Sequence, residues 1–309
     1  MNTKYSYSEL EVCYLANGSK YGIPVHTFEG KGDKVVGIGC CLHGDEIVTV
    51  EVGRRLVEFL KTQEVHGTVK VCPCVHTLAF EVEGRNNPLD GLNLNRVFPG
   101  NPNGFLTERI AYTYLEEFVA KLDAFVDVHA GGDALPLVNY CYILNDEAMS
   151  RSFGSDCLYR PSTDYQGNVN NFARERGVRC MVAECGGLMV READVQRCVE
   201  GCISVLRHEG MIDGEEIHRD DQVVCDYIAH VDPHHGGLMV PCLKEEDLGK
   251  VVEGKVPLAK IYNPKTTELL ETLYAPFERN YMILLRSNAN RAMPGDFSFM
   301  IADADAFEK

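Results

Sequence analysis

Two kinds of apolar segment recur along the first two thirds of the chain, short continuous runs and longer stretches with helical spacing. Residues 35–42 (VVGIGCCL) form a continuous apolar run with β-branched side chains, which is typical of a strand buried in a parallel sheet. Residues 47–61 place Val48, Val52 and Leu56 on one face of a helix. Additional strands are predicted at 68–75, 123–129, 137–144 and 179–184, and additional helices at 107–122, capped by Thr107, and at 194–208.

This succession of strands and helices predicts an α/β fold, with helices on both faces of a mostly parallel or mixed sheet. The pattern changes near residue 215, after which short alternating segments are separated by Gly, Pro, Asp and Asn. These segments lie at 222–229, 236–242, 255–262, 268–274, 280–287 and 296–302. We therefore expect two domains, residues 1–215 and a β-rich C-terminal domain at 216–309.

The charge and the cysteines narrow the class of protein. The chain has 30 Lys and Arg against 46 Asp and Glu, a net charge of −16, which argues against a nucleic-acid partner. No apolar run approaches the roughly 20 residues that span a bilayer, and the N-terminus lacks an apolar signal segment, so we expect no membrane partner and a cytoplasmic location. The 13 Cys lack disulfide-like spacing. The pairs Cys72/Cys74 and Cys198/Cys202 could bind a metal, but no second pair at zinc-site spacing accompanies either, so we expect reduced core residues.

The first candidate for chemistry is His43-Gly44-Asp45-Glu46, which stands where the first predicted strand ends and a helix begins. Sites in parallel α/β sheets form at the carboxyl ends of strands. His43 and Glu46 can direct a nitrogen and an oxygen at one point across the turn, and both are donors that zinc accepts. The alternative is a surface turn in which Asp45 and Glu46 favour the helix N-terminus.

A second histidine strengthens the metal interpretation. His129 ends the predicted strand 123–129 and should lie at the same edge of the sheet as His43. Together with Glu46 it completes a set of three protein ligands, which leaves a fourth position for water, as in catalytic zinc sites. On its own, a histidine at a strand end would more often be structural.

Glu184 is the candidate acid and base. It terminates the apolar segment 179–184 before Cys185-Gly186-Gly187, so it should be partly buried at the same edge of the sheet. A carboxylate beside zinc-bound water can accept its proton and pass it to a leaving amine. The alternative is a glutamate that caps a Gly-rich turn.

A polar loop at 85–96 (RNNPLDGLNLNR) is the candidate substrate-binding element. It has two Arg, four Asn and an Asp in twelve residues, so it cannot be a core element. A guanidinium binds a substrate carboxylate through two hydrogen bonds. A hydrated loop built from Asn and Asp turns is the alternative, and the apolar residues 97–99 directly after Arg96 fit that alternative poorly.

These motifs occur in a familiar order: a strand followed by HGDE, then R…DGLNLNRVFPG, DVHAGG and AECGG, all within residues 35–187. The sequence resembles the succinylglutamate desuccinylase/aspartoacylase family of the zinc carboxypeptidase-like superfamily. Within that family it is most similar to the N-acetyl-diaminobutyrate deacetylase-like members. The resemblance implies a zinc-dependent catalytic domain at 1–215 and a C-terminal β domain beside the active site at 216–309.

The resemblance also implies a role for each motif residue. His43, Glu46 and His129 match the family's ligands for one Zn²⁺ per chain. Glu184 matches the general base and acid. Arg85 matches the arginine that polarises the scissile carbonyl, although the length of the loop before Asn95 varies in the superfamily.

Substrate recognition follows from the same comparison. Asn95 and Arg96 match the pair that holds the substrate's carboxylate. Asp133 stands where the diaminobutyrate enzymes carry a Lys, which would change the charge beside the site and the substrate accepted. His234 and His235 of the second domain form a further candidate group that a loop could bring to the edge of the site.

The function that these inferences predict is hydrolysis of the amide bond of a small N-acyl amino acid. One alternative is a metallocarboxypeptidase acting on a small peptide with the same residues. Another is a zinc- or ligand-binding protein of this fold without turnover, which would have no need for Glu184 as a base. The sequence leaves the acyl group, the amino-acid side chain and the oligomeric state open, with a homo-oligomer as one option.

Overall fold

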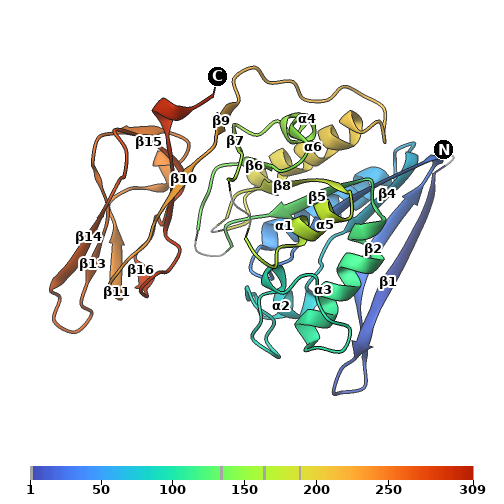
Figure 1. Ribbon diagram of the computed structural model, residues 1–309, viewed down its shortest axis with the longest axis horizontal. Coiled ribbons are helices and arrows are strands. Elements are labelled where there is room, and N and C mark those ends of the chain that lie inside the picture. Colours follow the sequence, from blue (N-terminus) through green and yellow to red (C-terminus); the bar gives the residue numbers. More distant parts are fainter. Residues whose placement is uncertain (1–2, 133–134, 163–164, 188, 309) are drawn as a thin grey trace.

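A nine-stranded mixed sheet forms the centre of the larger part of the molecule (Figure 1). The computed structural model describes residues 3–132, 135–162, 165–187 and 189–308. The order of the strands across the sheet is β1-β2-β4-β3-β5-β8-β6-β7-β9. The strands are β1 (Lys4–Tyr14), β2 (Lys20–Glu29), β3 (Lys31–Cys40), β4 (His66–Cys72), β5 (Ala124–His129), β6 (Tyr140–Ile143), β7 (Cys157–Tyr159), β8 (Arg179–Glu184) and β9 (Val223–Cys225).

The sheet is parallel at its centre, and an antiparallel pairing lies on each side of this centre. β4, β3, β5 and β8 run parallel to one another, and every residue of β5 is buried. β6 is antiparallel to β8, and the hairpin of β1 and β2 is added antiparallel to β4. The predicted α/β class with a mixed sheet is confirmed. The hairpin was not predicted, because β1 is largely exposed and therefore lacks a strong apolar pattern.

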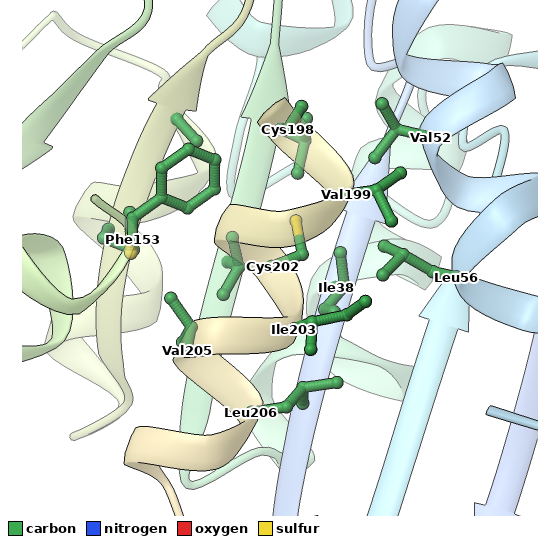
Figure 2. Packing of buried hydrophobic residues seen from close by; sticks show 14 of the residues in the cluster. Ile38, Val52, Leu56, Phe153, Cys198, Val199, Cys202, Ile203, Val205 and Leu206 are labelled. Atoms are coloured by element: carbon green, nitrogen blue, oxygen red, sulfur yellow. The ribbon is translucent and has the colours of Figure 1, made fainter. Parts of the chain in front are cut away.

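Helices cover both faces of the sheet, as predicted. α1 (Ile47–Leu60), α4 (Glu147–Ser152) and α6 (Glu192–His208) contribute to one buried cluster, and α3 (Leu106–Glu117) and α5 (Val169–Glu175) to the other. The helix α2 (Thr77–Glu81) is a single short turn after β4. Figure 2 shows how the first cluster packs: Val199 and Ile203 of α6 lie on the side of the helix that faces Leu56 of α1, near Ile38 of β3.

The start of α3 corrects one prediction. The helix begins at Leu106, with Phe105 rather than Thr107 as its N-cap. The backbone N–H of Thr107 donates to Asp90 Oδ2 at 2.9 Å, and its hydroxyl donates to Asp90 Oδ1 at 2.6 Å. A carboxylate from the polar loop thus satisfies the first turn of the helix, a partner that the local sequence could not reveal.

Two four-stranded antiparallel sheets pack together to form the C-terminal part, as the predicted β-rich domain required. Their strand orders are β10-β17-β15-β12 and β14-β13-β11-β16. The strands are β10 (Ile228–Val231), β11 (Gly237–Pro241), β12 (Val251–Glu253), β13 (Pro257–Tyr262), β14 (Leu269–Tyr274), β15 (Arg279–Leu284), β16 (Asn290–Ala292) and β17 (Phe299–Asp303). The boundary at 215/216 stays a prediction, because β9 still belongs to the large sheet.

Backbone hydrogen bonds join the C-terminal sheets to the loop that follows β5. The N–H of Val138 donates to Ile283 O at 2.9 Å, and the N–H of Leu285 donates to Pro136 O at 3.3 Å. An ion pair between Arg191 and Glu245 adds a second connection. The C-terminal part therefore holds the chain between β5 and β6, next to the edge of the sheet where His129 lies.

The composition led to two predictions, one about membrane-spanning segments and one about the cysteines, and both can be compared with the structure. No helix in the described part of the chain is long and apolar enough to cross a membrane. All 13 cysteines are free thiols, and all but Cys13 and Cys242 are buried. The eleven buried cysteines act as small apolar residues of the core, as predicted, whereas Cys13 and Cys242 lie outside it.

The packing of α1 generates a stability prediction. Leu56 is fully buried under α6, whereas Leu89 is 65% exposed on the polar loop. Leu56→Ala should lower the free energy of unfolding by about 2–5 kcal/mol, because it leaves a cavity in the core. Leu89→Ala should change it by less than about 0.5 kcal/mol. Urea unfolding followed by circular dichroism measures both, and equal effects of the two changes would contradict this packing.

Candidate metal centre

Three side chains meet where parallel strands of the central sheet end. His129 is the last residue of β5, and His43 follows the end of the neighbouring strand β3. Glu46 is the residue before the first turn of α1. All three are buried, and their ligand atoms lie within 4.8 Å of one another. The structure thus brings together the three residues that the sequence predicted as metal ligands.

The Glu46 carboxylate lies between the two imidazoles. His43 Nδ1 is 2.7 Å from Glu46 Oε1, and His129 Nδ1 is 3.0 Å from Glu46 Oε2. Although burial raises the pKa of Glu46, the two histidines outweigh that effect and hold the pKa well below its usual range. The carboxylate therefore stays ionised, and two nitrogens and a carboxylate face one point.

The outer nitrogen of each imidazole faces an oxygen acceptor. His43 Nε2 lies 3.2 Å from Asn93 Oδ1, which also accepts the backbone N–H of Asn95 at 2.9 Å. His129 Nε2 lies 3.1 Å from Asp127 Oδ2. Because both partners are acceptors, each ring donates from Nε2. With Nε2 as the donor to the residue behind the ring, Nδ1 is the nitrogen through which each imidazole would bind a metal ion.

The donor set fits a zinc ion. Two imidazole nitrogens and one carboxylate are three ligands of types that zinc accepts, and a three-ligand site keeps a fourth position open. A carboxylate or amide oxygen behind each ligating imidazole is the usual second layer of support in such sites. We therefore identify the buried group of His43, Glu46 and His129 as one that could hold a metal ion.

Glu184 lies beside this group on the next strand. It is the last residue of β8 and the register partner of His129 across β5 and β8. It is partly buried, and burial raises its pKa to about 7. A carboxyl group with such a pKa can both accept and release a proton near neutral pH. The sequence prediction that Glu184 shares this edge of the sheet agrees with its position.

Arg85 also reaches the group of candidate ligands. Its Nη1 lies 3.5 Å from Glu46 Oε1, and its side chain is half exposed. The backbone explains this approach, because the N–H of Gly44 donates to Gly84 O at 3.0 Å. A Cβ on Gly44 would lie 2.0 Å from the backbone of Ala79, so only glycine lets the two segments come this close.

Asn95 and Arg96 form a short 3-10 turn at Leu94–Arg96. Asn95 is buried, and its Oδ1 accepts the backbone N–H of Val169 at 3.0 Å. The Arg96 guanidinium lies 5.1 Å from the ring centre of Tyr165, and its Nη1 donates to Asn95 O at 2.8 Å. Both residues therefore hold a defined geometry, and the guanidinium is exposed for a ligand.

Several polar residues around the site were missed by the sequence analysis. Asn170 Nδ2 donates to Asp127 Oδ2 at 2.7 Å, behind the metal group. On β6, Tyr140 is the register partner of Glu184, and its hydroxyl lies 3.3 Å from that of Tyr142. The sequence predicted a strand at 137–144 but not its direction. That direction places these tyrosines beside Glu184.

Two further sequence predictions concern the pair His234 and His235 and the residue Asp133. The backbone N–H groups of His234 and His235 both donate to Glu271 Oε2 at 3.0 Å, and His235 Nδ1 lies 3.5 Å from the same atom. All of these contacts lie within the C-terminal part, so they give the two histidines a structural role in a turn. Asp133 lies outside the described residues.

A His-Glu-His group at the carboxyl ends of parallel strands, with a carboxylate beside it, is typical of metal-dependent hydrolases. Residues 32–208, more than half of the chain, match the family model for the succinylglutamate desuccinylase/aspartoacylase catalytic domain. The chain belongs to this family, as its motifs indicated.

Individual relatives agree with this assignment. The N-alpha-acetyl-L-2,4-diaminobutyric acid deacetylase of Halomonas elongata is 26% identical over an alignment of 276 residues, and the match covers 84% of this chain and 80% of the relative. A succinylglutamate desuccinylase from Silicibacter sp. TM1040 has a TM-score of 0.83 at 22% identity, over 97% of this chain and 95% of its own. The product-bound ectoine utilization protein EutE (DoeB) of Ruegeria pomeroyi has a TM-score of 0.83 at 22% sequence identity, and the match covers 96% of this chain and 94% of that protein.

The geometry of the three candidate ligands generates a prediction about metal binding. The wild-type protein should bind about one zinc ion per chain, and His129→Ala should bind it at least about 100-fold more weakly, because one of three ligands is lost. His234→Ala is the matched control and should bind zinc as the wild type does. Competition with a chelator and elemental analysis measure both. Undiminished zinc affinity in His129→Ala would remove His129 from the set of ligands.

Proposed function

We propose that this protein is a zinc-dependent hydrolase that cleaves the amide bond of a small N-acyl amino acid. The observation that supports this most is the position of Glu184 beside the group of His43, Glu46 and His129, with a pKa of about 7. A metal-binding protein without turnover needs no such carboxyl group. Family membership and the deacetylase relative point to the same class of reaction.

The three candidate ligands would hold one zinc ion per chain. When bound, zinc acts as a Lewis acid that activates water and polarises the carbonyl group that it meets. The protein contributes the orientation of the ligands, because Asn93 and Asp127 fix both imidazoles.

Glu184 moves the proton in this proposal. As a carboxylate it accepts a proton from the attacking water, and as a carboxylic acid it donates that proton to the departing amine nitrogen. Its raised pKa suits both steps, because neither form is strongly favoured near neutral pH. Arg85 would donate hydrogen bonds to the carbonyl oxygen as negative charge develops on it, from its position 3.5 Å from Glu46.

Arg96 and Asn95 orient the substrate in this proposal. The exposed guanidinium of Arg96 is held by Tyr165 and by Asn95 O, so its planar donors are already arranged for a carboxylate. Ordering these donors before binding lowers the entropy that the substrate loses, which favours both affinity and rate. A free carboxylate next to the scissile amide is a feature of N-acyl amino acids.

A metallocarboxypeptidase would use the same residues, with Arg96 binding the carboxylate of a C-terminal amino acid. A panel of N-acetyl and N-succinyl amino acids, tested beside dipeptides on the zinc-loaded protein, separates the two reactions. We expect turnover of the N-acyl amino acids. Faster turnover of dipeptides would favour the peptidase, and no turnover of either class would favour a binding protein.

The position of Glu184 generates a prediction about the chemical step. Glu184→Gln keeps the shape of the side chain but cannot accept a proton. It should retain zinc and substrate affinity while kcat falls by about 10²–10⁴-fold, the usual contribution of general acid–base catalysis. Glu175→Gln, on the exposed side of α5, is the control and should leave kcat unchanged. A Glu184→Gln enzyme within twofold of the wild type would exclude Glu184 from the mechanism.

A second prediction concerns the carboxylate. Arg96→Lys keeps the charge but loses the planar pair of donors and the stacking on Tyr165. We expect kcat/KM on an N-acyl amino acid to fall by about 100-fold or more, on the order of 3 kcal/mol, as for a truncated charge pair. Arg176→Lys, in a surface ion pair with Glu116, is the matched control and should leave kcat/KM unchanged.

The amide of the same substrate completes the test of Arg96. The wild type should prefer the free acid strongly over its amide, and Arg96→Lys should lose most of that preference, because the interaction removed is with the carboxylate. If the wild type hydrolyses acid and amide equally well, the site recognises no carboxylate and Arg96 is a structural residue of its loop.

A further inference from the structure

The polar loop that carries Asn95 and Arg96 is held from outside by a second segment, residues 165–170, which we call the clasp. Its first contact is the ring of Tyr165, which lies under the Arg96 guanidinium at 5.1 Å. Stacking of a guanidinium on a tyrosine ring fixes the plane of its donors. The clasp and the loop are about 70 residues apart in the sequence, so only the fold brings them together.

The second contact runs through the backbone of Gly167. Its carbonyl accepts the N–H of Phe98 at 3.2 Å. Gly167 has a φ of +71°, and a Cβ there would lie 2.1 Å from Arg96 O. Glycine is thus required twice at this position, for the left-handed backbone and for the close approach to the turn that carries Arg96.

The last two residues of the clasp diverge toward the two halves of the site. The backbone N–H of Val169 donates to Asn95 Oδ1 at 3.0 Å, on the side of the substrate-binding loop. The side chain of Asn170 donates to Asp127 Oδ2 at 2.7 Å, on the side of the metal group. Adjacent residues at the start of α5 therefore connect the two halves directly.

The contact of Asn170 matters because of what Asp127 does. The same oxygen, Oδ2, also accepts from His129 Nε2 at 3.1 Å. Asp127 and Asn170 are almost completely buried, at 0% and 1% exposure, so no solvent can replace a lost donor. With Asn170 in place, one carboxylate oxygen is fixed toward the His129 ring. Without it, that oxygen keeps a single donor and the carboxylate can rotate.

We propose that the clasp is a positioning element that sets the distance between the substrate-binding loop and the metal centre, with Asn170 and Gly167 as its two positioning residues. This inference rests on the proposed function, since it assigns the loop to the substrate and the His129 group to zinc. Asn170 acts on zinc through Asp127 and His129. Gly167 acts on the substrate through the backbone of Arg96.

The two residues should therefore give different defects. Asn170→Leu keeps the size of the side chain but removes the donor to Asp127. It should weaken zinc binding by about 10–100-fold, the usual effect of losing a partner behind a metal ligand. Gly167→Ala displaces the backbone of Arg96. It should weaken binding of an N-acetyl amino acid by about tenfold or more while zinc affinity stays within twofold of the wild type.

The experiment measures the two affinities separately on the full chain. Zinc affinity is determined by competition with a chelator on the metal-free protein, and N-acetyl amino acid affinity by calorimetry on the zinc-loaded Glu184→Gln background, where turnover is slow. Asn170→Ser, which is smaller and keeps a hydroxyl donor, is the second variant should Asn170→Leu fail to fold, and is expected to weaken zinc binding less. Cobalt loading adds a spectroscopic signature, since the visible bands of bound Co²⁺ should shift when the His129 ring is reoriented.

The chain offers a matched control for each change. Gly177 also has a left-handed backbone, with a φ of +79°, but a Cβ there meets no atom within 4 Å. Gly177→Ala should therefore destabilise the fold without changing substrate affinity. Asn145→Leu removes two hydrogen bonds between the loop after β6 and the start of β8, to Val178 O and from Cys180 N–H, and neither reaches Asp127. It should lower the Tm without changing zinc affinity.

The outcomes separate this inference from the proposed function. Unchanged zinc affinity in both Asn170 variants, or a loss of zinc affinity in Gly167→Ala equal to that in Asn170→Leu, overturns the clasp as a positioning element. Equal effects of Gly177→Ala and Gly167→Ala on substrate affinity overturn it too. Absence of turnover by the wild type would refute the proposed hydrolase function. The affinity measurements would then still test whether the clasp is a positioning element.

Discussion

The site depends on one costly feature, an ionised carboxylate that is buried between two imidazoles. Glu46 is 2% exposed, and its charge loses almost all of its hydration on folding. The two Nδ1 atoms of His43 and His129 and the guanidinium of Arg85 compensate for that loss. The compensation holds only if the rings cannot turn, and this need accounts for the polar side chains packed behind them.

The support behind the imidazoles comes from segments that are distant in the sequence. Asn93 of the polar loop accepts from His43, and Asp127 of β5 accepts from His129. Strand β5 is buried along its whole length, so Asp127 is fixed by the sheet itself, whereas Asn93 is fixed by the turn that it caps. The roles that we propose for these residues, metal ligands on a rigid sheet and substrate-binding groups on a supported loop, follow a common division in α/β enzymes.

The C-terminal part also contacts the segments that surround the site. Strand β15 and the residue after it, Leu285, form backbone hydrogen bonds with Val138 and Pro136, in the chain that leaves the site after β5. Its strand β17 provides Met300, whose sulfur accepts the Tyr140 hydroxyl at 3.9 Å. The second set of sheets therefore supports the wall beside Glu184, which gives the β-rich segment a structural reason to accompany the catalytic part.

The sequence by itself determined the α/β class, the β-rich tail and the edge of the sheet where the site lies, because buried strands and the helices after them carry strong local patterns. It also predicted His43, Glu46, His129 and Glu184 as the candidate site, since His43 follows a buried strand, His129 and Glu184 each end one, and Glu46 stands at the start of the next helix. Only the tertiary structure decided the exposed hairpin of β1 and β2, the reversed direction of β6, and the contact of Asn170 with Asp127. These features rest on pairings between segments far apart in the chain, and the free energy of such pairings comes from burial and hydrogen bonds that no local pattern encodes.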